Sequence, residues 1–417
     1  MSMIYNPKKS ILTVIFVFIF GMACAKTVYV CPAGCTYNAI SAAIDAAMPH
    51  DTVVIKKGVY YVRNVKITKP IFITGENGAE IDGGSKHHIF VVETGNTTIQ
   101  GLKFCNTGSS GMEDMAGIRV EKSASITISH NIFDNCYFGI FLAYGDKAII
   151  KNNTFFGGSK GLTETGNGIH CWKADSVLIR DNYTSGHRDG IYFEFVTNSE
   201  IINNRSYKNS RYGLHFMFSD GNSYRGNTFA NNGAGVAVMY SKKINMQYNR
   251  FADNWGGSAY GLLLKDINDC SIYNNSFTNN TAGAYIEGSN RVSFKNNVFS
   301  KNGWAVRLLA NCVADTFEGN IFTGNTFDFS SNGTLSNNIL AANYWDKYEG
   351  YDLDRNGVGD VPYRPISAYS VVIENVPLAM VFMRSLMVDM MDKTERVLPS
   401  LIPENIIDKQ PLMKQPL

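Results

Sequence analysis

The sequence has almost no net charge for its length. Its 417 residues include 38 lysines and arginines against 36 aspartates and glutamates, which gives a formal net charge of +2. Binding to nucleic acid phosphates normally requires a strong basic excess in one region. The charge balance therefore argues against a dedicated nucleic-acid surface, and no nucleic acid is expected as a partner. Contents of 45% hydrophobic and 18% charged residues are ordinary for a folded protein.

The apolar run near the N-terminus is too short for a typical membrane span. A spanning helix needs about 20 apolar residues, whereas this run covers residues 11–20. It follows Lys8 and Lys9 and precedes an Ala-x-Ala pattern that ends at Ala25. Residues 1–25 are therefore predicted to be a cleaved secretory signal peptide. An uncleaved anchor and a lipid attached to Cys24 remain open alternatives.

Cysteine is scarce, with 8 in the chain, and loss of the signal peptide would leave an odd number. At least one thiol must then be unpaired or used otherwise. Cys31 and Cys35 can close a small disulfide in an oxidising compartment. Two free thiols are the alternative for this pair.

What the sequence does have is an internal repeat of about 22 residues. Two short strand signals per repeat, separated by Asn and Gly turns, are too closely spaced for helical repeats or for crossover helices. The pattern predicts an all-β fold, a parallel β-helix with one coil per repeat. The recurring asparagines are Asn131, Asn153, Asn182, Asn204, Asn227, Asn249, Asn275, Asn297 and Asn320. The recurring glycines are Gly117, Gly139, Gly168, Gly190, Gly213, Gly235, Gly261 and Gly283.

The organisation along the chain follows from where the repeat begins and ends. We expect a β-helix over residues 26–340, with residues 36–48 forming a short amphipathic helix that caps the open N-terminal end. Residues 341–369 are expected to form a capping segment with an Asp-rich loop. Residues 370–417 are expected to form a helical docking tail.

Alternation within each coil separates two faces. The residue after each glycine and the residue two further along are apolar in every coil, so they predict the core, and the asparagines predict an internal ladder. The intervening positions form a stripe of aromatic, histidine and methionine side chains that is unusual for a solvated face. The predicted partner-binding surface consists of His170, Trp172, Tyr192, Glu194, His215, Met217 and Met239.

Three residues of this stripe suggest a metal. Met217 and Met239 fall on adjacent coils, about 4.8 Å apart in a sheet, and His215 is two residues from Met217. Two thioethers and an imidazole suit Cu(I) better than zinc, calcium or magnesium. The alternative is that the methionines cover an apolar surface of the chain or of a partner.

A second metal pattern follows the last repeat. Asp352, Asp354, Asn356 and Asp360 occupy positions 1, 3, 5 and 9 of an EF-hand-like spacing. The bidentate acid at position 12 is missing, because Tyr363 stands there. The segment therefore predicts a calcium-like loop or, alternatively, an Asx-turn plug that closes the solenoid.

The acids of the stripe are not arranged for catalysis. Glycoside hydrolysis needs two carboxyl groups at a defined separation, but Glu121, Glu194 and Glu287 lie three and four coils apart. Turn chemistry explains residues 187–189 at least as well as catalysis does. We expect no enzyme activity. A polysaccharide-binding or polysaccharide-modifying β-helix is the alternative function, and a passive adhesin is a third class.

Residues 376–398 are strongly apolar, and their methionines recur at near-helical spacing. A helix that packs back on the solenoid is one explanation. A helix that docks on a partner or a membrane surface is the other. The candidate docking residues are Met380, Met383 and Met387.

Several ordered segments resemble the NosD family of nitrous-oxide reductase maturation proteins. They are GNGIHCW (166–172), RDGIYFE (188–194), LHFMFSDGNSYRGN (214–227) and VAVMYS (236–241), followed by NYWDKYEGYDLDRNGVGDVPYRP and by the PLAM and PLM segments of the tail. The resemblance spans essentially the mature chain, and the ordered C-terminal segments make it specific.

The resemblance implies a right-handed parallel β-helix, of the kind found in carbohydrate-binding and sugar-hydrolase-like repeat proteins. It also implies a periplasmic, non-catalytic subunit associated with an inner-membrane complex. Such proteins work with an ABC-type permease and a cytoplasmic ATPase to assemble the copper–sulfur centres of nitrous-oxide reductase, and they are described as copper-binding. The stripe would then face the reductase or a copper chaperone, and the methionine-rich tail would dock on the permease.

Overall fold

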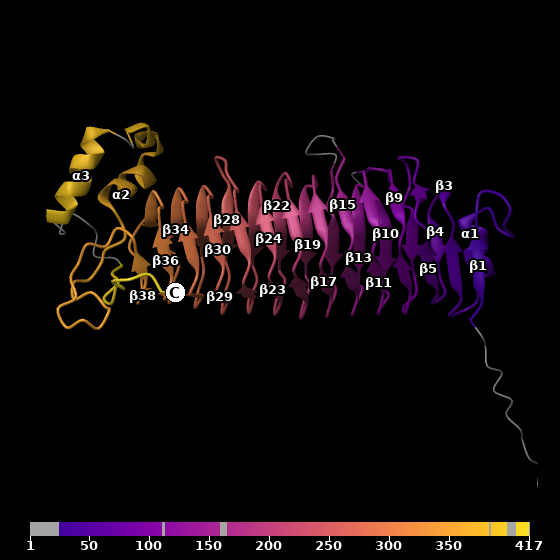
Figure 1. Ribbon diagram of the computed structural model, residues 1–417, viewed down its shortest axis with the longest axis horizontal. Coiled ribbons are helices and arrows are strands. Elements are labelled where there is room, and N and C mark those ends of the chain that lie inside the picture. Colours follow the sequence, from indigo (N-terminus) through magenta and orange to yellow (C-terminus); the bar gives the residue numbers. More distant parts are fainter. Residues whose placement is uncertain (1–24, 111–112, 159–164, 383–384, 398–405, 417) are drawn as a thin grey trace, which may run out of the picture.

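The computed structural model describes residues 25–110, 113–158, 165–382, 385–397 and 406–416. These residues form one elongated solenoid of parallel strands, with a helical extension at its C-terminal end (Figure 1). The predicted signal peptide lies outside the described residues, apart from Ala25.

Three parallel sheets run the length of the solenoid, and each coil adds one strand to each sheet. Sheet A has 14 strands in the described residues: β1 (Thr27–Val30), β2 (Thr52–Ile55), β5 (Phe72–Gly75), β8 (Thr98–Gln100), β11 (Thr127–Ser129), β14 (Ile149–Lys151), β17 (Leu178–Arg180), β20 (Glu200–Ile202), β23 (Ser223–Arg225), β26 (Asn245–Gln247), β29 (Ser271–Tyr273), β32 (Ser293–Lys295), β35 (Thr316–Glu318) and β38 (Ile339–Ala341).

Sheet B has 13 strands over the same part of the chain: β3 (Gly58–Tyr61), β6 (Ala79–Asp82), β9 (Lys103–Cys105), β12 (Ile132–Asp134), β15 (Thr154–Phe156), β18 (Tyr183–Ser185), β21 (Arg205–Tyr207), β24 (Thr228–Ala230), β27 (Arg250–Ala252), β30 (Ser276–Thr278), β33 (Val298–Ser300), β36 (Ile321–Thr323) and β39 (Tyr344–Trp345).

Sheet C, which carries the predicted stripe, has 12 strands in the described ranges: β4 (Val65–Ile67), β7 (Phe90–Val92), β10 (Ala116–Glu121), β13 (Phe138–Ala143), β16 (Ile169–Trp172), β19 (Asp189–Glu194), β22 (Tyr212–Met217), β25 (Ala234–Met239), β28 (Tyr260–Lys265), β31 (Ala282–Glu287), β34 (Trp304–Leu308) and β37 (Phe327–Ser330).

The predicted asparagine ladder is confirmed. From Asn153 onward, the Oδ1 atom of each ladder asparagine accepts from the backbone N–H and the side-chain amide of its counterpart one coil earlier, as Asn249 Oδ1 does from Asn227 N and Nδ2, both at 3.0 Å. The same amide donates to a backbone carbonyl of an earlier coil, as Asn249 Nδ2 does to Tyr224 O at 3.0 Å. The buried amides of this column are thereby paired with hydrogen-bond partners. This pairing allows a column of polar side chains to lie inside the core.

Phenylalanine rings stack beside this ladder. Phe251, Phe277, Phe299 and Phe322 lie 4.6–5.1 Å apart between ring centroids, with nearly parallel planes.

The recurring glycines allow this packing. A Cβ atom on Gly213 would lie 2.7 Å from the Gly235 carbonyl oxygen and 3.0 Å from the Phe229 ring, so only glycine fits between stacked coils.

The two ends of the solenoid are covered differently. At the N-terminal end, α1 (Ile40–Ala46) buries Ile40, Ala43 and Ile44 over the first coil, which confirms the predicted capping helix. At the C-terminal end, Asp408 extends the asparagine ladder, since its Oδ2 accepts from Asn343 N at 3.1 Å and from Trp345 Nε1 at 3.1 Å. The tail thus returns to the solenoid and seals its last coil.

The helical extension differs from the single helix that the methionine spacing predicts. It consists of α2 (Ala368–Asn375), a 3₁₀ segment η1 (Pro377–Phe382) and α3 (Leu386–Val397). The first break falls at Pro377, which cannot donate the backbone hydrogen bond that a continuous α-helix would need there. Within the described residues, no helix is both long and apolar enough to span a membrane.

Candidate functional site

The site predicted from the sequence lies on the outward face of sheet C, near the middle of the solenoid around β19 and β22 (Figure 1). The strand register confirms the predicted neighbours. Met217 pairs directly with Met239 across β22 and β25. Tyr192 pairs with His215, and Glu194 pairs with Met217, across β19 and β22. Met217 therefore lies one coil, and Met239 two coils, from Tyr192 and Glu194.

This face is more closed than the alternation suggests. Trp172, Tyr192, Met217 and Met239 are half-buried, and His215 is only 4% exposed. The expectation that the whole stripe is exposed is wrong for His215. Large neighbouring side chains cover the imidazole, because the rings of Tyr192 and Tyr212 lie 4.8 and 4.9 Å from it between centroids.

His215 is held on one side by a buried ion pair. Arg211 donates from Nε to Asp189 Oδ1 at 2.8 Å and makes a second, very short contact from Nη2 to Oδ2. His215 Nδ1 lies 3.6 Å from Asp189 Oδ2. Burial alone would raise the pKa of the Asp189 carboxyl, but the hydrogen bonds and positive charge of Arg211 outweigh burial and keep that pKa below its usual value.

The other imidazole nitrogen, Nε2, is available to bind a ligand. His215 Nε2 is buried and has no hydrogen-bond partner among the described residues. Asp189 begins β19 and Arg211 directly precedes β22, so the ion pair that Nδ1 approaches lies at the start of these strands. Burial lowers the pKa of His215 despite the opposing effect of Asp189, which favours the neutral ring that a metal requires.

Tyr192 connects the imidazole to the methionines. Its ring contacts His215, and its hydroxyl donates to the Met217 sulfur at 3.6 Å. One side chain therefore touches both an imidazole and a thioether of the predicted copper site. Because Tyr192 also contacts the ring of His170, at 4.7 Å between centroids, these contacts join four of the seven predicted surface residues.

His170 and Trp172 belong to a neighbouring aromatic cluster. The His170 ring lies 4.7 Å from Phe141 and 5.2 Å from Phe138 between centroids, and its Nδ1 lies 3.1 Å from Asn167 Nδ2. Burial lowers the pKa of His170 to about 3. Its ring is therefore neutral and packed as part of the scaffold. Trp172 extends the cluster outward, with the Lys173 ammonium 4.7 Å from its ring.

A row of aromatic rings beside the methionines was missed from the sequence. Phe195, Phe218 and Tyr240 stack with centroids 5.2 and 5.1 Å apart, and each is more than 40% exposed. All three adopt positive φ angles, from 50° to 54°. The available signal was their position, since each directly follows a stripe residue. The alternation of residues within a strand does not predict where the side chains of the following turn point, so the alternation did not indicate this row.

The Asp-rich loop is built from Asx turns. Asp352 accepts from the backbone N–H groups of Asn356 and Gly357 at 3.1 and 2.9 Å, and Asp360 accepts from Leu353 N at 2.7 Å. These carboxylates thus already stabilise the loop backbone. In the described parts of the chain, no group of three or more His, Cys, Asp or Glu side chains is arranged to hold a metal ion. The calcium-like site stays a prediction.

The docking residues of the tail are only partly visible. Met383 lies outside the described residues, Met380 lies within η1, and Met387 in α3 is 56% exposed. Other apolar side chains of the extension are even more open, with Leu378 at 81% and Val381 at 83% exposure. The described part of the helical extension therefore presents an apolar surface that includes Met387 and Met390.

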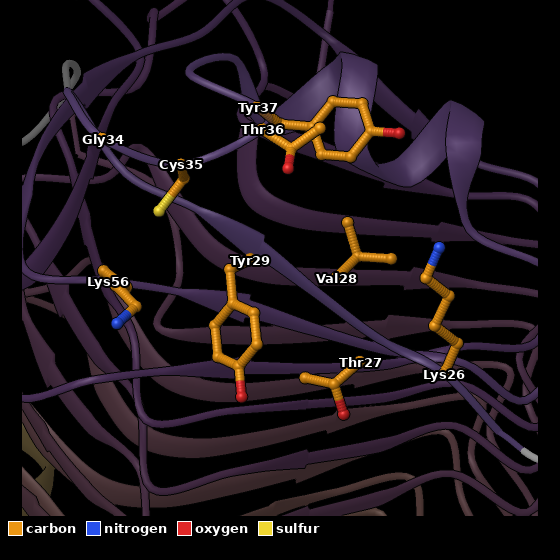
Figure 2. A pocket seen from close by; sticks show the side chains of 9 residues that line it. All are labelled: Lys26, Thr27, Val28, Tyr29, Gly34, Cys35, Thr36, Tyr37 and Lys56. Carbon is orange, nitrogen blue, oxygen red and sulfur yellow. The ribbon is translucent and has the colours of Figure 1, made fainter.

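A cavity of about 380 Å³ lies at the opposite end of the molecule, between β1 and the loop that follows it (Figure 2). Its described lining has two lysines, two tyrosines, two threonines and no carboxylate. It is far along the solenoid from the methionine pair. The lining residues are Lys26, Thr27, Val28, Tyr29, Gly34, Cys35, Thr36, Tyr37 and Lys56.

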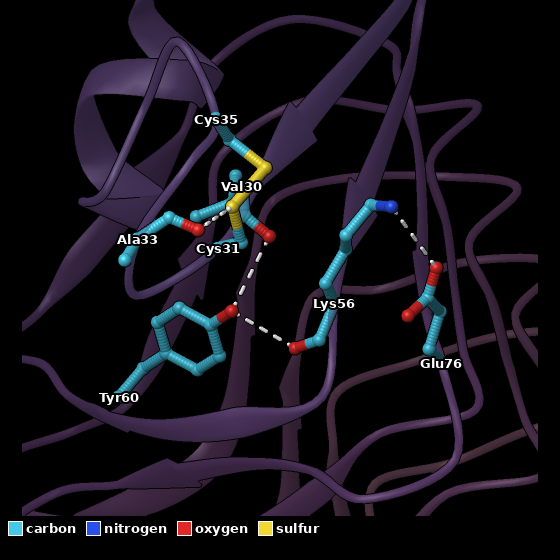
Figure 3. Close-up of a disulfide and its surroundings, with 7 residues drawn as sticks. All are labelled: Val30, Cys31, Ala33, Cys35, Lys56, Tyr60 and Glu76. Carbon is cyan, nitrogen blue, oxygen red and sulfur yellow. Dashed lines mark hydrogen bonds and ion pairs between the residues drawn. A yellow bond between two sulfur atoms is a disulfide. The ribbon is translucent and has the colours of Figure 1, made fainter.

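The same loop carries the predicted disulfide, which is confirmed between Cys31 and Cys35 (Figure 3). Next to it, Tyr60 donates to the backbone carbonyls of Val30 and Lys56, at 3.2 and 2.8 Å. This network fastens the first coil. The free cysteines of the described residues, Cys105, Cys136, Cys171, Cys270 and Cys312, are all buried.

The fold defines a class of protein, the right-handed parallel β-helix. A model described as a right-handed beta helix region matches residues 48–183. The chain resembles PfbA, a surface adhesin of Streptococcus pneumoniae, with 16% identity, a TM-score of 0.51 and coverage of 73% of this chain and 86% of that one. It also resembles a family 28 exopolygalacturonase of Yersinia enterocolitica, with 10% identity, a TM-score of 0.50 and coverage of 76% and 78%. At these identities the likeness concerns the fold alone.

Within that class, the chain is similar to the NosD family over part of its length. The model of the NosD family, described as periplasmic copper-binding protein, matches residues 158–350. This segment contains His215, Met217 and Met239. A relative in Pseudomonas aeruginosa, named as a probable ABC transporter binding protein NosD, is 28% identical over 85% of this chain and 87% of its own length. The resemblance seen in the ordered sequence motifs is thereby confirmed.

Proposed function

We propose that this chain is a periplasmic, non-catalytic accessory protein that carries Cu(I) during assembly of the copper–sulfur centres of nitrous-oxide reductase. The observation that carries the proposal is the grouping of the paired Met217 and Met239 with His215, whose buried Nε2 has no partner among the described residues. The NosD match over the same coils supports it.

The chemistry of the group suits a transferable cuprous ion. Thioether sulfurs and a neutral imidazole are soft ligands, which prefer Cu(I) over the harder divalent ions. All three ligands are uncharged, so the binding and the release of Cu(I) change the charge of the protein groups very little. The half-buried methionines lie on the same face of sheet C as the covered imidazole, and a partner that delivers or receives copper can approach them there.

The neighbouring surface fits a protein partner. The exposed rings of Phe195, Phe218 and Tyr240 run beside the methionine pair. Exposed aromatic rows of this kind are enriched where protein surfaces meet. We assign this face to the reductase or to a copper chaperone.

The helical extension is the proposed contact with an ABC-type permease, which works with a cytoplasmic ATPase. Arg307 of β34 binds Glu374 of α2 through two hydrogen bonds of 3.0 and 2.7 Å, and Ser330 donates to the same carboxylate at 3.0 Å. These contacts fix α2 on sheet C while Leu378, Val381 and Leu386 remain exposed. A rigidly held apolar surface is suited to docking against a membrane subunit. The name of the Pseudomonas aeruginosa relative is consistent with this partner.

The acids of the stripe support a non-catalytic role. Glu121 pairs with Arg119 at 2.6 Å, and Glu287 pairs with Lys265 at 3.3 Å. Each of these carboxylates is engaged by a cation on its own coil or the preceding one. Neither is paired with a second acid at the spacing that glycoside hydrolysis requires.

A Cu(I) competition titration under anaerobic conditions tests the proposed site. The double variant Met217→Ser/Met239→Ser should bind Cu(I) at least about tenfold more weakly than the wild type, because two soft ligands are replaced by hydroxyls. Met48→Ser is the matched control, since Met48 is 67% exposed and lies beyond the end of α1. Equal affinity of the double variant and the control would show that the thioether pair is not the copper site.

A further inference from the structure

The Nδ1 atom of His215 lies near two groups, one of which can only donate a hydrogen bond and one of which can only accept. Nδ1 lies 3.3 Å from Arg211 Nη2, which can only donate, and 3.6 Å from Asp189 Oδ2, which can only accept. Asp189 is fully buried. A neutral imidazole carries its proton on only one of its two nitrogens. If Nδ1 accepts from Arg211, the proton is on Nε2; if Nδ1 donates to Asp189, Nε2 has a free lone pair.

We propose that Asp189 and Arg211 are positioning residues that switch the tautomer of His215 between its copper-free and copper-bound forms. In the copper-free protein, Arg211 donates to Nδ1, and the proton lies on Nε2. When Nε2 binds Cu(I), that proton leaves Nε2, a proton occupies Nδ1, and Nδ1–H donates to Asp189. The ring stays neutral throughout, so uptake involves no net loss of a proton. This inference rests on the proposed copper site.

The surroundings of the ring support a fixed imidazole with a movable proton. Tyr192 and Tyr212 pack against the ring from two sides. The Asp189 carboxylate is held by Arg211 through two contacts and by Tyr212 N at 3.2 Å. Metal-binding histidines usually donate their second N–H to a carboxylate or carbonyl, which fixes the tautomer that leaves a lone pair for the metal. Asp189 is placed to be that carboxylate.

A second ion pair of the same type provides a matched control. Arg291 donates from Nε and Nη2 to Asp269 at 2.6 and 3.1 Å, again across a spacing of 22 residues. This pair is exposed and contacts no histidine in the described residues. A substitution there alters an arginine–aspartate pair of the solenoid without touching His215.

The experiment combines Ag(I), as an air-stable substitute for Cu(I), with ¹⁵N NMR of histidine-labelled full-length mature protein. In the copper-free wild type, the His215 signals should report a proton on Nε2, and saturation with Ag(I) should move the proton to Nδ1. Asp189→Asn should lower Ag(I) affinity at least tenfold, because the amide removes the negative charge and replaces one of the two accepting oxygens with an NH₂ group that can only donate. Arg211→Lys should change affinity less than threefold and should lower the fraction with Nε2–H. Asp269→Asn should change neither.

Two results would overturn the switch. One is a wild-type His215 tautomer that is the same with and without Ag(I). The other is an equal loss of affinity and of melting temperature in Asp189→Asn and Arg211→Lys, which marks a purely structural ion pair. The wild-type comparison does not depend on either variant folding. If the wild type binds Ag(I) but the Met217→Ser/Met239→Ser variant binds it equally well, the proposed copper site fails instead, whatever the NMR result.

Discussion

At the scale of single residues, His187 is the least satisfied group of the core. It occupies the position that Asn209 and Asn232 hold in the following coils, and its backbone N–H donates to Asn209 Oδ1 at 3.1 Å. Both ring nitrogens are buried and have no partner in the described residues. The ring lies beside Thr184, where the column of phenylalanines is interrupted.

A second asparagine ladder consists of Asn209, Asn232, Asn254, Asn280, Asn302 and Asn325. We expect His187→Asn to stabilise the protein by about 1 kcal/mol, because it removes two unsatisfied nitrogens and extends this second ladder by one rung. The new amide can donate to Asn209 Oδ1, as Asn209 Nδ2 does to Asn232 Oδ1 at 3.0 Å. Urea unfolding at neutral pH measures the change. Asn302→Ala, which removes a rung, should destabilise. A destabilised His187→Asn variant would show that ring packing outweighs the missing hydrogen bonds.

The buried histidines also predict acid sensitivity. Burial lowers the pKa of His170 to about 3 and that of His187 to about 4, whereas both have a pKa near 6.5 in the unfolded chain. Between about pH 4 and 6.5 the unfolded state binds more protons, so the free energy of unfolding must fall as the pH falls. Each group contributes up to about 1.4 kcal/mol per pH unit. Urea titrations at several pH values should show this slope, and His187→Asn should reduce it. If the pH dependence of the unfolding free energy were the same in His187→Asn as in the wild type, His187 would not be a source of the acid sensitivity.

At the scale of elements, the last rung of the first ladder comes from the tail. Asp408 is fully buried, and its Oδ2 accepts from Asn343 N, Asn343 Nδ2 and Trp345 Nε1. The backbones of Asp408 and Tyr363 also exchange two hydrogen bonds, at 2.8 and 2.9 Å. The tail therefore replaces the next coil of the solenoid.

Asp408→Ala should destabilise the C-terminal end by about 2–4 kcal/mol, because three buried donors lose their acceptor. Hydrogen exchange should accelerate in β38 and β39 and remain slow in the central coils. Asp408→Asn keeps an accepting oxygen and should retain part of the protection. Asp354→Ala, in the exposed loop nearby, serves as the control. Uniform acceleration along the whole solenoid would contradict a local capping role.

Much of this architecture was predictable because the repeat specifies it. A spacing of about 22 residues determines the coils, the glycine column, the first ladder and the direct pairing of Met217 with Met239. The burial of His215 was not predictable, because it depends on Tyr192 and Tyr212 lying over the ring. The role of Asp408 was not predictable either, because it lies 65 residues beyond its partner Asn343 and belongs to no repeat.

At the scale of the whole molecule, copper binding and docking are assigned to separate regions. The proposed copper site lies in the middle of sheet C, whereas the helical extension packs over β31, β34 and β37 at the end of the same sheet. The two regions share a rigid scaffold but no side chain. Their substitutions should therefore have independent effects.

Leu378→Glu/Val381→Glu should abolish co-purification with the ABC-type permease while leaving Cu(I) affinity unchanged, because it introduces charge into the apolar surface of η1. Leu353→Glu is the control, since Leu353 is 79% exposed but lies in the Asp-rich loop. Affinity capture from detergent-solubilised membranes measures the association. Retention of the permease by the double variant would place the contact elsewhere.

The central claim is that this chain supplies copper to the reductase through Met217 and Met239. The most direct measurement is the absorption spectrum and copper content of nitrous-oxide reductase purified from a strain that lacks the chain. The account predicts a reductase without its catalytic copper–sulfur centre, restored by the wild-type gene but not by Met217→Ser/Met239→Ser. A fully assembled reductase in the deletion strain would contradict the account.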